Sequence, residues 1–276
     1  TYFINNGGLI FSASNDSALN TLPSNPAVAS IRAAGQVGNN KFINWLEDIN
    51  PDIICLQEIK ATPQQFDSKQ FESIGYKCFW YPAEKKGYSG VAILSKKRPE
   101  KIIYGCGEKI FDDEGRVLIA KYKNINVFSC YFPSGTSGSS RQSYKMNFLK
   151  VFYKFIDENF KGQNCVISGD FNICHKAIDI HNPVSNKNSS GFLPEERDWM
   201  SGFLRLGFVD TFREKNLSPH QYSWWSYRAN SRLKNKGWRI DYHMLSKVLT
   251  NKINEAKILQ DVHHSDHCPI LLDVNI

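Results

Sequence analysis

Short apolar runs, each ending in small polar or charged side chains, divide the chain into predicted strands. The clearest run is 165–167, followed by Ser168-Gly169-Asp170-Phe171-Asn172. An unbroken run of β-branched and apolar residues is typical of a buried strand. Asp170 and Asn172 are two positions apart, so in extended backbone their side chains point the same way. The pattern predicts a carboxylate and a carboxamide together at the carboxyl end of a strand, where open α/β sheets bind ligands. A strand followed by an Asx-type turn is the alternative.

The same pattern predicts further strands and three helices. Residues 53–56 form a second apolar run, which ends in Gln57-Glu58 and so places another carboxylate where a buried strand emerges. The order strand 125–132, helix 141–158, strand 165–168 is that of a βαβ crossover. The other predicted strands are 76–81, 90–94, 117–122 and 270–274, and the other helices are 41–49 and 195–206.

Two stretches lack a regular pattern. Residues 173–193 contain Asn182, Asn186, Asn188 and Gly191, and we expect a functional loop because a helical pattern follows at 195–206. Residues 1–30 are rich in Asn, Ser, Gly and Ala; a strand is expected at 9–13, and the remainder is predicted to be turns or loops. We therefore predict one domain over 31–276, preceded by an atypical segment.

Composition narrows the class of protein. The chain has 276 residues, is 41% hydrophobic and carries a formal net charge of +7, which permits a polyanionic partner. The chain contains no apolar run long enough to span a bilayer, and its first residues lack the features of a signal peptide. Its seven cysteines include no C-x-x-C spacing, so we expect a protein of the reducing cytoplasm. The sequence also lacks an amphipathic basic helix, so we expect no membrane partner.

Basic and aromatic residues alternate in 222–239, and no acidic residue lies between Arg228 and Arg239. This arrangement suits phosphate contacts combined with an apolar wedge or stacking surface, while a solvated basic loop is the alternative. Beyond it lie Asp241 and the sequence Ser265-Asp266-His267, before the last predicted strand. An adjacent Asp–His pair, with a second Asp available, can polarise an imidazole.

Five motifs in this order make the chain resemble exonuclease III, the exodeoxyribonuclease III type of apurinic/apyrimidinic endonuclease. They are Leu56-Gln57-Glu58, Gly169-Asp170-Phe171-Asn172, Gly-Phe-Leu-Pro-Glu-Glu-Arg at 191–197, Lys-Asn-Lys-Gly-Trp-Arg-Ile-Asp-Tyr at 234–242, and Ser265-Asp266-His267-Cys268-Pro269. The match covers roughly 31–276. The Gly-Asp-x-Asn and Ser-Asp-His motifs are shared across the endonuclease/exonuclease/phosphatase superfamily, whereas the segments 191–197 and 234–242 are far more specific to its DNA-repair branch.

The resemblance implies an α/β fold, a four-layer sandwich of the DNase I-like type with two central, mostly antiparallel sheets flanked by helices. It implies a Mg²⁺-dependent phosphodiesterase, with Mn²⁺ as the alternative metal. The substrate would be double-stranded DNA cut 5′ to abasic sites, with 3′–5′ exonuclease or 3′-phosphodiesterase activity at 3′ ends. We expect a cytoplasmic monomer that would act at the nucleoid in a bacterium.

The resemblance also implies roles for the matched residues in hydrolysis. Glu58 would be the main metal ligand, and Asp266 would lie beside the metal. Asp170 would activate or align the attacking water, and Asn172 would help to orient the water or the phosphate. Tyr131 would donate a hydrogen bond to the scissile phosphate.

Further roles follow for recognition and charge stabilisation. Asp241 would orient His267, which would contact the phosphate. Trp224 and Trp238 would form the wall of a pocket for the extruded sugar. The residues expected to contact DNA through their charge are Arg228, Arg232 and Lys234.

One motif departs from the family. The first strand of the family normally carries an Asn that supports the metal site, and Ile31-Arg32 matches the end of that motif. Ala27 and Ala29 align with its two Asn positions, unless Asn15 is the substitute. Two alternative functions follow: a catalytically weakened DNA-binding relative, or a phosphoesterase of the superfamily acting on a lipid or small molecule. The first is disfavoured because the candidate active-site residues are all present, namely Glu58, Asp170, Asn172, Asp241, Asp266 and His267. The second is disfavoured by the basic, aromatic segment 222–239.

Overall fold

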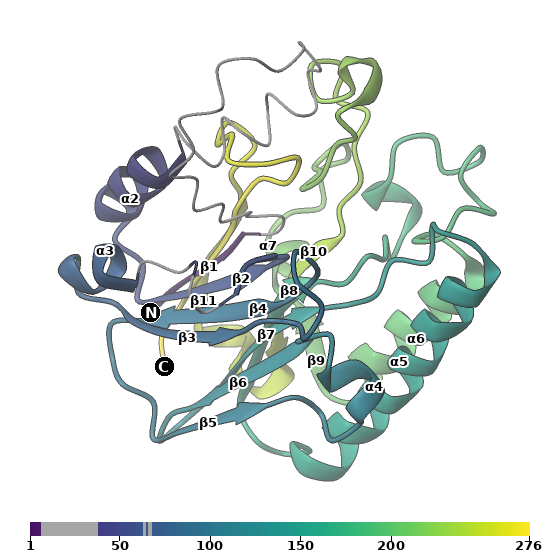
Figure 1. Ribbon diagram of the computed structural model, residues 1–276. Helices are drawn as coiled ribbons and strands as arrows, with labels where there is room; N and C mark the ends of the chain where they lie inside the picture. Colours follow the sequence, from purple (N-terminus) through teal and green to yellow (C-terminus); the bar gives the residue numbers. More distant parts are fainter. Residues whose placement is uncertain (7–37, 63–64, 66–67) are drawn as a thin grey trace.

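Two six-stranded mixed sheets pack face to face at the centre of the molecule (Figure 1). The computed structural model describes residues 1–6, 38–62, 65 and 68–276. In spatial order, the first sheet consists of β11 (Ile253–Ile258), β12 (Ile270–Val274), β1 (Tyr2–Asn6), β2 (Ile53–Gln57), β4 (Val91–Ser95) and β3 (Lys77–Tyr81). The second consists of β5 (Lys101–Tyr104), β6 (Val117–Lys121), β7 (Asn126–Tyr131), β8 (Cys165–Asp170), β10 (Asp241–Ser246) and β9 (Phe208–Asp210). Among these strands the pairs β1–β2 and β7–β8 are parallel, and the other pairs are antiparallel.

Helices cover the outer face of each sheet. α2 (Gly38–Ile49) and α3 (Ser68–Ser73) pack on the first sheet through Phe42, Leu46 and Phe71. α5 (Ser139–Asn159) and α6 (Pro194–Arg205) pack side by side on the second sheet. The four layers confirm the predicted sandwich. Shorter helices are α4 (Lys109–Asp112), α7 (Thr211–Lys215), η3 (Ala177–Asp179), η4 (Arg228–Asn230) and η5 (Lys247–Lys252).

Burial on both faces explains why the central strands are continuous apolar runs. In β2, Ile53 and Cys55 belong to the core between the two sheets, whereas Ile54 and Leu56 belong to the core beneath α2 and α3. Successive side chains of a strand point to opposite faces, so a strand covered on both sides needs apolar residues at every position. The position of β2 between the two cores is therefore fixed by its side chains, and Glu58 follows it directly at the edge of the sandwich.

The predicted βαβ crossover is present. β7 pairs in parallel with β8 from Asn126↔Cys165 to Tyr131↔Asp170, and α5 connects the two strands. Parallel pairing requires such a long connection and brings the carboxyl ends of both strands to the same edge. Tyr131 and Asp170 are therefore neighbours in register at that edge.

The prediction of turns and loops at the start of the chain is wrong over Tyr2–Asn6. This segment is β1, which pairs in parallel with β2 and antiparallel with β12, so it is an interior strand of the first sheet. The residues proposed for a strand at 9–13, together with Asn15, Ala27 and Ala29, lie outside the described residues. No helix in the described part of the chain is long and apolar enough to cross a membrane.

Candidate active site

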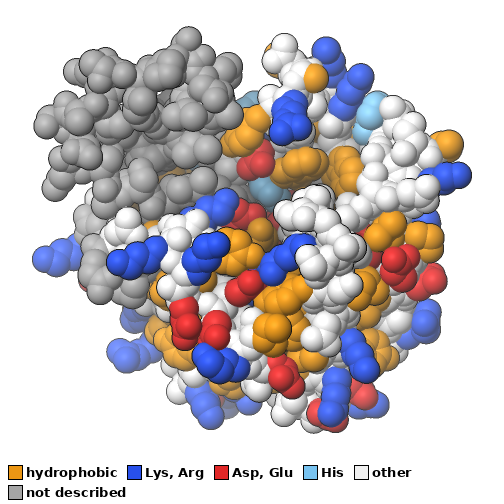
Figure 2. Space-filling view, turned by 45° about the vertical axis from the view of Figure 1, so that its right-hand side comes forward, with side chains coloured by type: hydrophobic (Ala, Val, Ile, Leu, Met, Phe, Trp, Pro, Cys, Tyr) orange, Lys and Arg blue, Asp and Glu red, His pale blue; other side chains and the backbone are white. Residues whose placement is uncertain are grey.

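A cavity of about 970 Å³ opens at the edge of the sandwich where β2, β7 and β8 end. Figure 2 shows acidic and histidine side chains in this hollow, with Lys and Arg side chains around it. The predicted site residues that line it are Glu58, Tyr131, Asp170, Asn172, Trp224, Arg228, Trp238, Asp266 and His267. The structure thus brings together residues that are distributed over most of the sequence.

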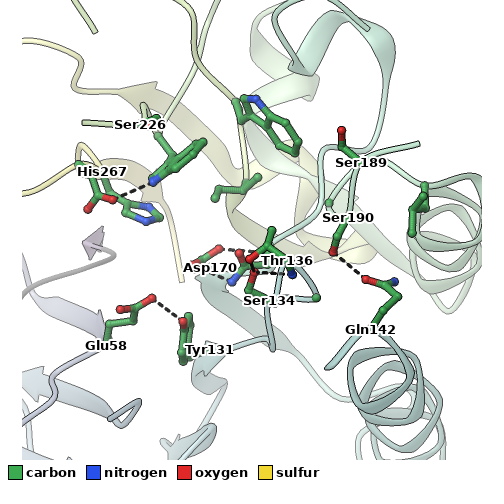
Figure 3. A pocket seen from close by; sticks show the side chains of 18 of the residues that line it. Glu58, Tyr131, Ser134, Thr136, Gln142, Asp170, Ser189, Ser190, Ser226 and His267 are labelled. Atoms are coloured by element: carbon green, nitrogen blue, oxygen red, sulfur yellow. Dashed lines mark hydrogen bonds between the residues drawn. The ribbon is translucent and has the colours of Figure 1, made fainter. Parts of the chain in front are cut away.

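Glu58 and Tyr131 meet across the two sheets (Figure 3). The Tyr131 hydroxyl donates a hydrogen bond to Glu58 Oε1, and the Lys60 ammonium forms an ion pair with Glu58 Oε2. Burial alone would raise the pKa of Glu58, but Lys60, Tyr131 and His267 together lower it. Burial raises the pKa of Tyr131 well above its usual range, and the charge of Glu58 adds to the effect. The phenol therefore remains a hydrogen-bond donor beside an ionised carboxylate.

Several residues at these strand ends have left-handed backbone. The φ angles are 52° at Glu58, 48° at Lys60 and 52° at Asn172. Residues other than glycine rarely adopt this conformation, and strain of this kind is concentrated at functional sites. At Asn172, the turn is held by its own backbone N–H, which donates to Asp170 Oδ1 at 2.8 Å.

Asp170 and Asn172 stand together as predicted, although the backbone is not extended through both. The Asn172 side-chain amide lies 3.1 Å from Asp170 Oδ2 and also donates to the Phe132 carbonyl at 2.9 Å. The expected strand end and the alternative Asx-type turn are therefore both present. Burial and then the charge of Asp241 raise the pKa of Asp170 well above its usual range, with His267 opposing the rise. A raised pKa suits a carboxylate that takes a proton from water.

His267, which lines the cavity, forms a buried pair with Asp241. Nδ1 of His267 lies 2.8 Å from Asp241 Oδ2, so Nε2 is the ring nitrogen that Asp241 does not contact. Burial would lower the pKa of His267, but Asp241, its hydrogen bond, Asp170 and Asp266 raise it to about 10. The imidazole therefore carries a positive charge at neutral pH, and Asp241 acts on the cavity through His267.

An apolar compartment adjoins these charged groups. Trp224 and Trp238 meet edge to face, with ring centroids 6.1 Å apart, and pack on Ile180, Phe192 and Ile240. The Trp224 indole N–H donates to Asp266 Oδ2 at 2.9 Å, so the aromatic wall is fixed to a site carboxylate. The two indoles form one side of the cavity.

The predicted basic residues are placed differently from one another. Arg228 is exposed at the rim of the cavity, and Lys234 is exposed outside its lining. Arg232 stacks on Trp225 and donates to the carbonyls of Ser265, Gln260 and Val262. The Arg232 guanidinium thus holds the loop before His267.

The carboxylates fit a hard divalent cation. The described residues contain no group of three or more His, Cys, Asp or Glu side chains arranged to hold a metal ion. Mg²⁺ sites in phosphoryl-transfer enzymes use one or two carboxylates, with water and substrate phosphate as the other ligands. Glu58 is ionised and already accepts a cationic partner, the Lys60 ammonium, at Oε2. Asp266 provides a second carboxylate in the same cavity.

The strand β1 ends in Asn5-Asn6, and its backbone pairs with β2 up to this point. Asn6 pairs with Leu56 in parallel register, two residues before Glu58. By the resemblance, the family's first-strand Asn positions align with Ala27 and Ala29, or Asn15 is the substitute, because Ile31-Arg32 resembles the end of that motif. The one feature of the sequence that indicated a strand end here was the apolar Phe3-Ile4 directly before Asn5-Asn6.

Other residues of the site were not predicted. Lys60 was missed because a Lys after a strand is usually a solvated charge. Lys145 and Glu196 were missed because helical residues of this kind are usually exposed, yet both are fully buried beneath the cavity.

The site belongs to a class of phosphoester hydrolases built on two-sheet sandwiches, and comparison with known proteins agrees. The chain belongs to the endonuclease/exonuclease/phosphatase family, whose sequence model matches residues 32–267. It is 41% identical over 238 residues to an exodeoxyribonuclease of Bacillus subtilis, a match that covers 85% of this chain and 92% of that protein. It is 37% identical to the DNA repair nuclease APEX1 of Danio rerio, over 83% of this chain and 75% of that protein.

A solved structure supports the same relationship. An AP endonuclease from Archaeoglobus fulgidus superposes with a TM-score of 0.82 and is 26% identical, with 100% of this chain and 99% of that chain covered. The resemblance to exonuclease III-type nucleases is therefore confirmed, as are the fold and the class of enzyme. This family consists of divalent-metal-dependent hydrolases of phosphodiester bonds.

Proposed function

We propose that the protein is a Mg²⁺-dependent DNA-repair phosphodiesterase that cuts duplex DNA 5′ to abasic sites, with 3′–5′ exonuclease or 3′-phosphodiesterase activity at 3′ ends. One observation supports it above all: the hydrolytic groups and the apolar Trp224–Trp238 compartment share a single cavity. Hydrolysis of a phosphodiester needs an aligned water and donors to the phosphate oxygens. Selection of a base-less sugar needs an apolar pocket that is too small for a nucleotide.

The residues divide the reaction between them. Asp170 would accept a proton from the attacking water, which Asn172 would help to orient. The Tyr131 hydroxyl and the His267 imidazolium would donate hydrogen bonds to the phosphate oxygens, where negative charge increases during attack. A Mg²⁺ ion at Glu58 and Asp266 would supply charge neutralisation when bound. Mn²⁺ is the alternative metal.

DNA recognition would use the rim. Arg228 would reach the gap left by the extruded sugar, and Lys234 would contact a phosphate. Arg232 would contribute by holding the loop that carries Asp266 and His267. We propose that the enzyme acts as a monomer, because one chain supplies every group in this scheme.

The decisive test uses a duplex with one tetrahydrofuran abasic analogue, labelled at the 5′ end. The expected result is a single cut 5′ to the analogue with Mg²⁺ and none with EDTA. Glu58→Gln should lower the single-turnover rate by orders of magnitude, since it replaces a charged oxygen ligand with an amide. Glu255→Gln is the matched control, because Glu255 is a partly exposed residue of β11 that pairs with Lys257 and does not line the cavity.

The other outcomes separate the alternatives. Tight binding of the abasic duplex without cleavage would indicate a catalytically weakened relative. Hydrolysis of small phosphomonoesters or lipid phosphates, with no action on DNA, would indicate another branch of the superfamily. Full activity in EDTA, or in Glu58→Gln, would exclude the proposed metal role.

A further inference from the structure

Lys145 and Glu196 form an ion pair that is completely buried between α5 and α6. The Lys145 ammonium lies 2.6 Å from Glu196 Oε1, and both side chains have 0% exposure. Removing two charges from water is costly, and a buried pair is often no more stabilising than apolar residues of the same volume. The contacts that this pair makes with its surroundings therefore matter more than the pair itself.

The Lys145 ammonium reaches the active site through the backbone. It donates to the Asn172 carbonyl at 2.8 Å. Asn172 is the residue with left-handed φ whose side chain bonds Asp170. A charged donor on its carbonyl fixes the orientation of the peptide that follows, and charge-assisted bonds are about twice as strong as neutral ones.

The Glu196 carboxylate holds the opposite side of the cavity. Oε2 accepts the backbone N–H of Gly191 at 2.7 Å and of Leu193 at 3.0 Å. Oε1 accepts the Gln142 side-chain amide at 3.0 Å in addition to Lys145. Figure 3 shows the neighbouring Ser190–Gln142 hydrogen bond at the cavity wall, which extends the same network.

Gly191 is where the two sides meet. Its φ is +96°, and a Cβ atom there would lie 2.9 Å from Cζ3 of Trp238 and 3.1 Å from the Asn172 carbonyl oxygen. The Gly191 carbonyl in turn accepts the N–H of Cys174 at 2.7 Å. The backbone at Gly191 therefore packs directly against both the Trp238 indole and the turn that carries Asn172.

We propose that Lys145 and Glu196 are positioning residues that lock the Asn172 turn to the Gly191 turn and so set the distance between the hydrolytic groups and the Trp238 wall. This inference rests on the proposed function, because it assigns the pair to cleavage and to abasic preference. A misplacement of about 1 Å in such a site can cost about a hundredfold in rate. A role confined to packing α5 on α6 would affect stability alone.

The test compares four variants on abasic and intact duplexes. Lys145→Met removes the ammonium, and Lys145→Arg keeps a charged donor. Lys145→Met/Glu196→Gln removes both charges while the Gln side-chain oxygen still accepts a backbone N–H of the Gly191–Leu193 turn, which should preserve folding even where the single variant does not. Lys154→Met is the matched control, since Lys154 lies on the same helix in an exposed ion pair with Glu158. The readouts are melting temperature, DNA dissociation constant and single-turnover rate with Mg²⁺.

The inference predicts that the double variant melts near the wild type and binds DNA within about twofold, yet cleaves at least about tenfold more slowly with reduced abasic preference. Lys145→Arg should recover a large part of the rate, and Lys154→Met should match the wild type. A double variant that regains wild-type rate together with wild-type melting temperature would overturn the inference. Failure of the wild type itself to cut the abasic duplex would instead overturn the proposed function.

Discussion

Replacing Asp241 with Asn should change both the charge of His267 and the pH dependence of the enzyme. The side chains lie 2.8 Å apart, and Asn keeps the shape of Asp while removing its charge. Burial favours the neutral imidazole, and Asp241 is the strongest of the groups that oppose this and raise the pKa of His267 to about 10. In Asp241→Asn only Asp170 and Asp266 remain to oppose burial, so the pKa of His267 should fall.

The size of the effect follows from linkage. A rise in pKa from 6.5 to about 10 corresponds to about 5 kcal/mol, at about 1.36 kcal/mol per pH unit. Because the folded pKa is raised, this stabilisation is complete below pH 6.5 and is lost as pH rises through about 10. The unfolding free energies of wild type and Asp241→Asn should therefore differ by up to about 5 kcal/mol at about pH 6, and the difference should shrink as pH rises through about 10.

Two measurements check this reasoning. Urea unfolding of the metal-free proteins across this pH range gives the difference in stability. Single-turnover cleavage of a tetrahydrofuran duplex gives the alkaline limit of activity, which should move from about 10 toward 6.5 in the variant. Asp261→Asn is the control for the loss of a negative charge alone, because Asp261 is exposed in the loop that carries His267. A stability difference that stays constant with pH, or an unchanged alkaline limit, would refute the assigned role of Asp241.

Three further predictions concern recognition and the support of the site. Trp238→Ala should lower the ratio of abasic to intact cleavage by about tenfold or more while circular dichroism stays normal, because an apolar contact of this kind discriminates by about 1–3 kcal/mol. Lys234→Ser should reduce the slope of log affinity against log salt by about 1, whereas Arg232→Met should chiefly lower the melting temperature, since Arg232 donates to three carbonyls. Burial would raise the pKa of Asp179, but Arg239 and Arg213 lower it from 3.8 to about 2. Asp179→Asn should therefore cost about 2 kcal/mol above about pH 4, a difference that urea unfolding should show disappearing as pH falls through about 2.

The sequence predicted best where burial dictates composition. The apolar runs at β2 and β8 have no solvent face, so their positions and the polar residues after them followed directly from the pattern. The strand β11 was missed because its pairing shifts register between Ile253 and Glu255, which interrupts the alternation that identifies a strand. The strand β1 was missed because only two apolar residues, Phe3 and Ile4, separate Tyr2 from Asn5.

Charged residues were harder to interpret because the same residue type serves opposite purposes. Arg228 and Arg232 are four positions apart in one basic segment, yet one is exposed at the cavity rim and the other binds carbonyls of the adjacent loop. The helix α5 also carries other Lys residues, and only the ion pair with Glu196 of α6 distinguishes Lys145 from them. Tertiary contacts of this kind are not encoded in local periodicity.

The charges within the cavity explain why hydrolysis here would require an added cation. Glu58, Asp170 and Asp266 line the cavity, together with Lys60, His267 and, exposed at the rim, Arg228. The two cationic groups inside the cavity already have anionic partners, since Lys60 pairs with Glu58 and His267 with Asp241. A phosphodiester entering this space brings further negative charge into a region of low dielectric, where unbalanced charge is costly. A divalent cation at Glu58 would offset that charge, so binding of DNA and of the cation should each strengthen the other. The carboxylates that would make the cavity unfavourable for DNA alone are therefore the groups that suit it to DNA and metal together.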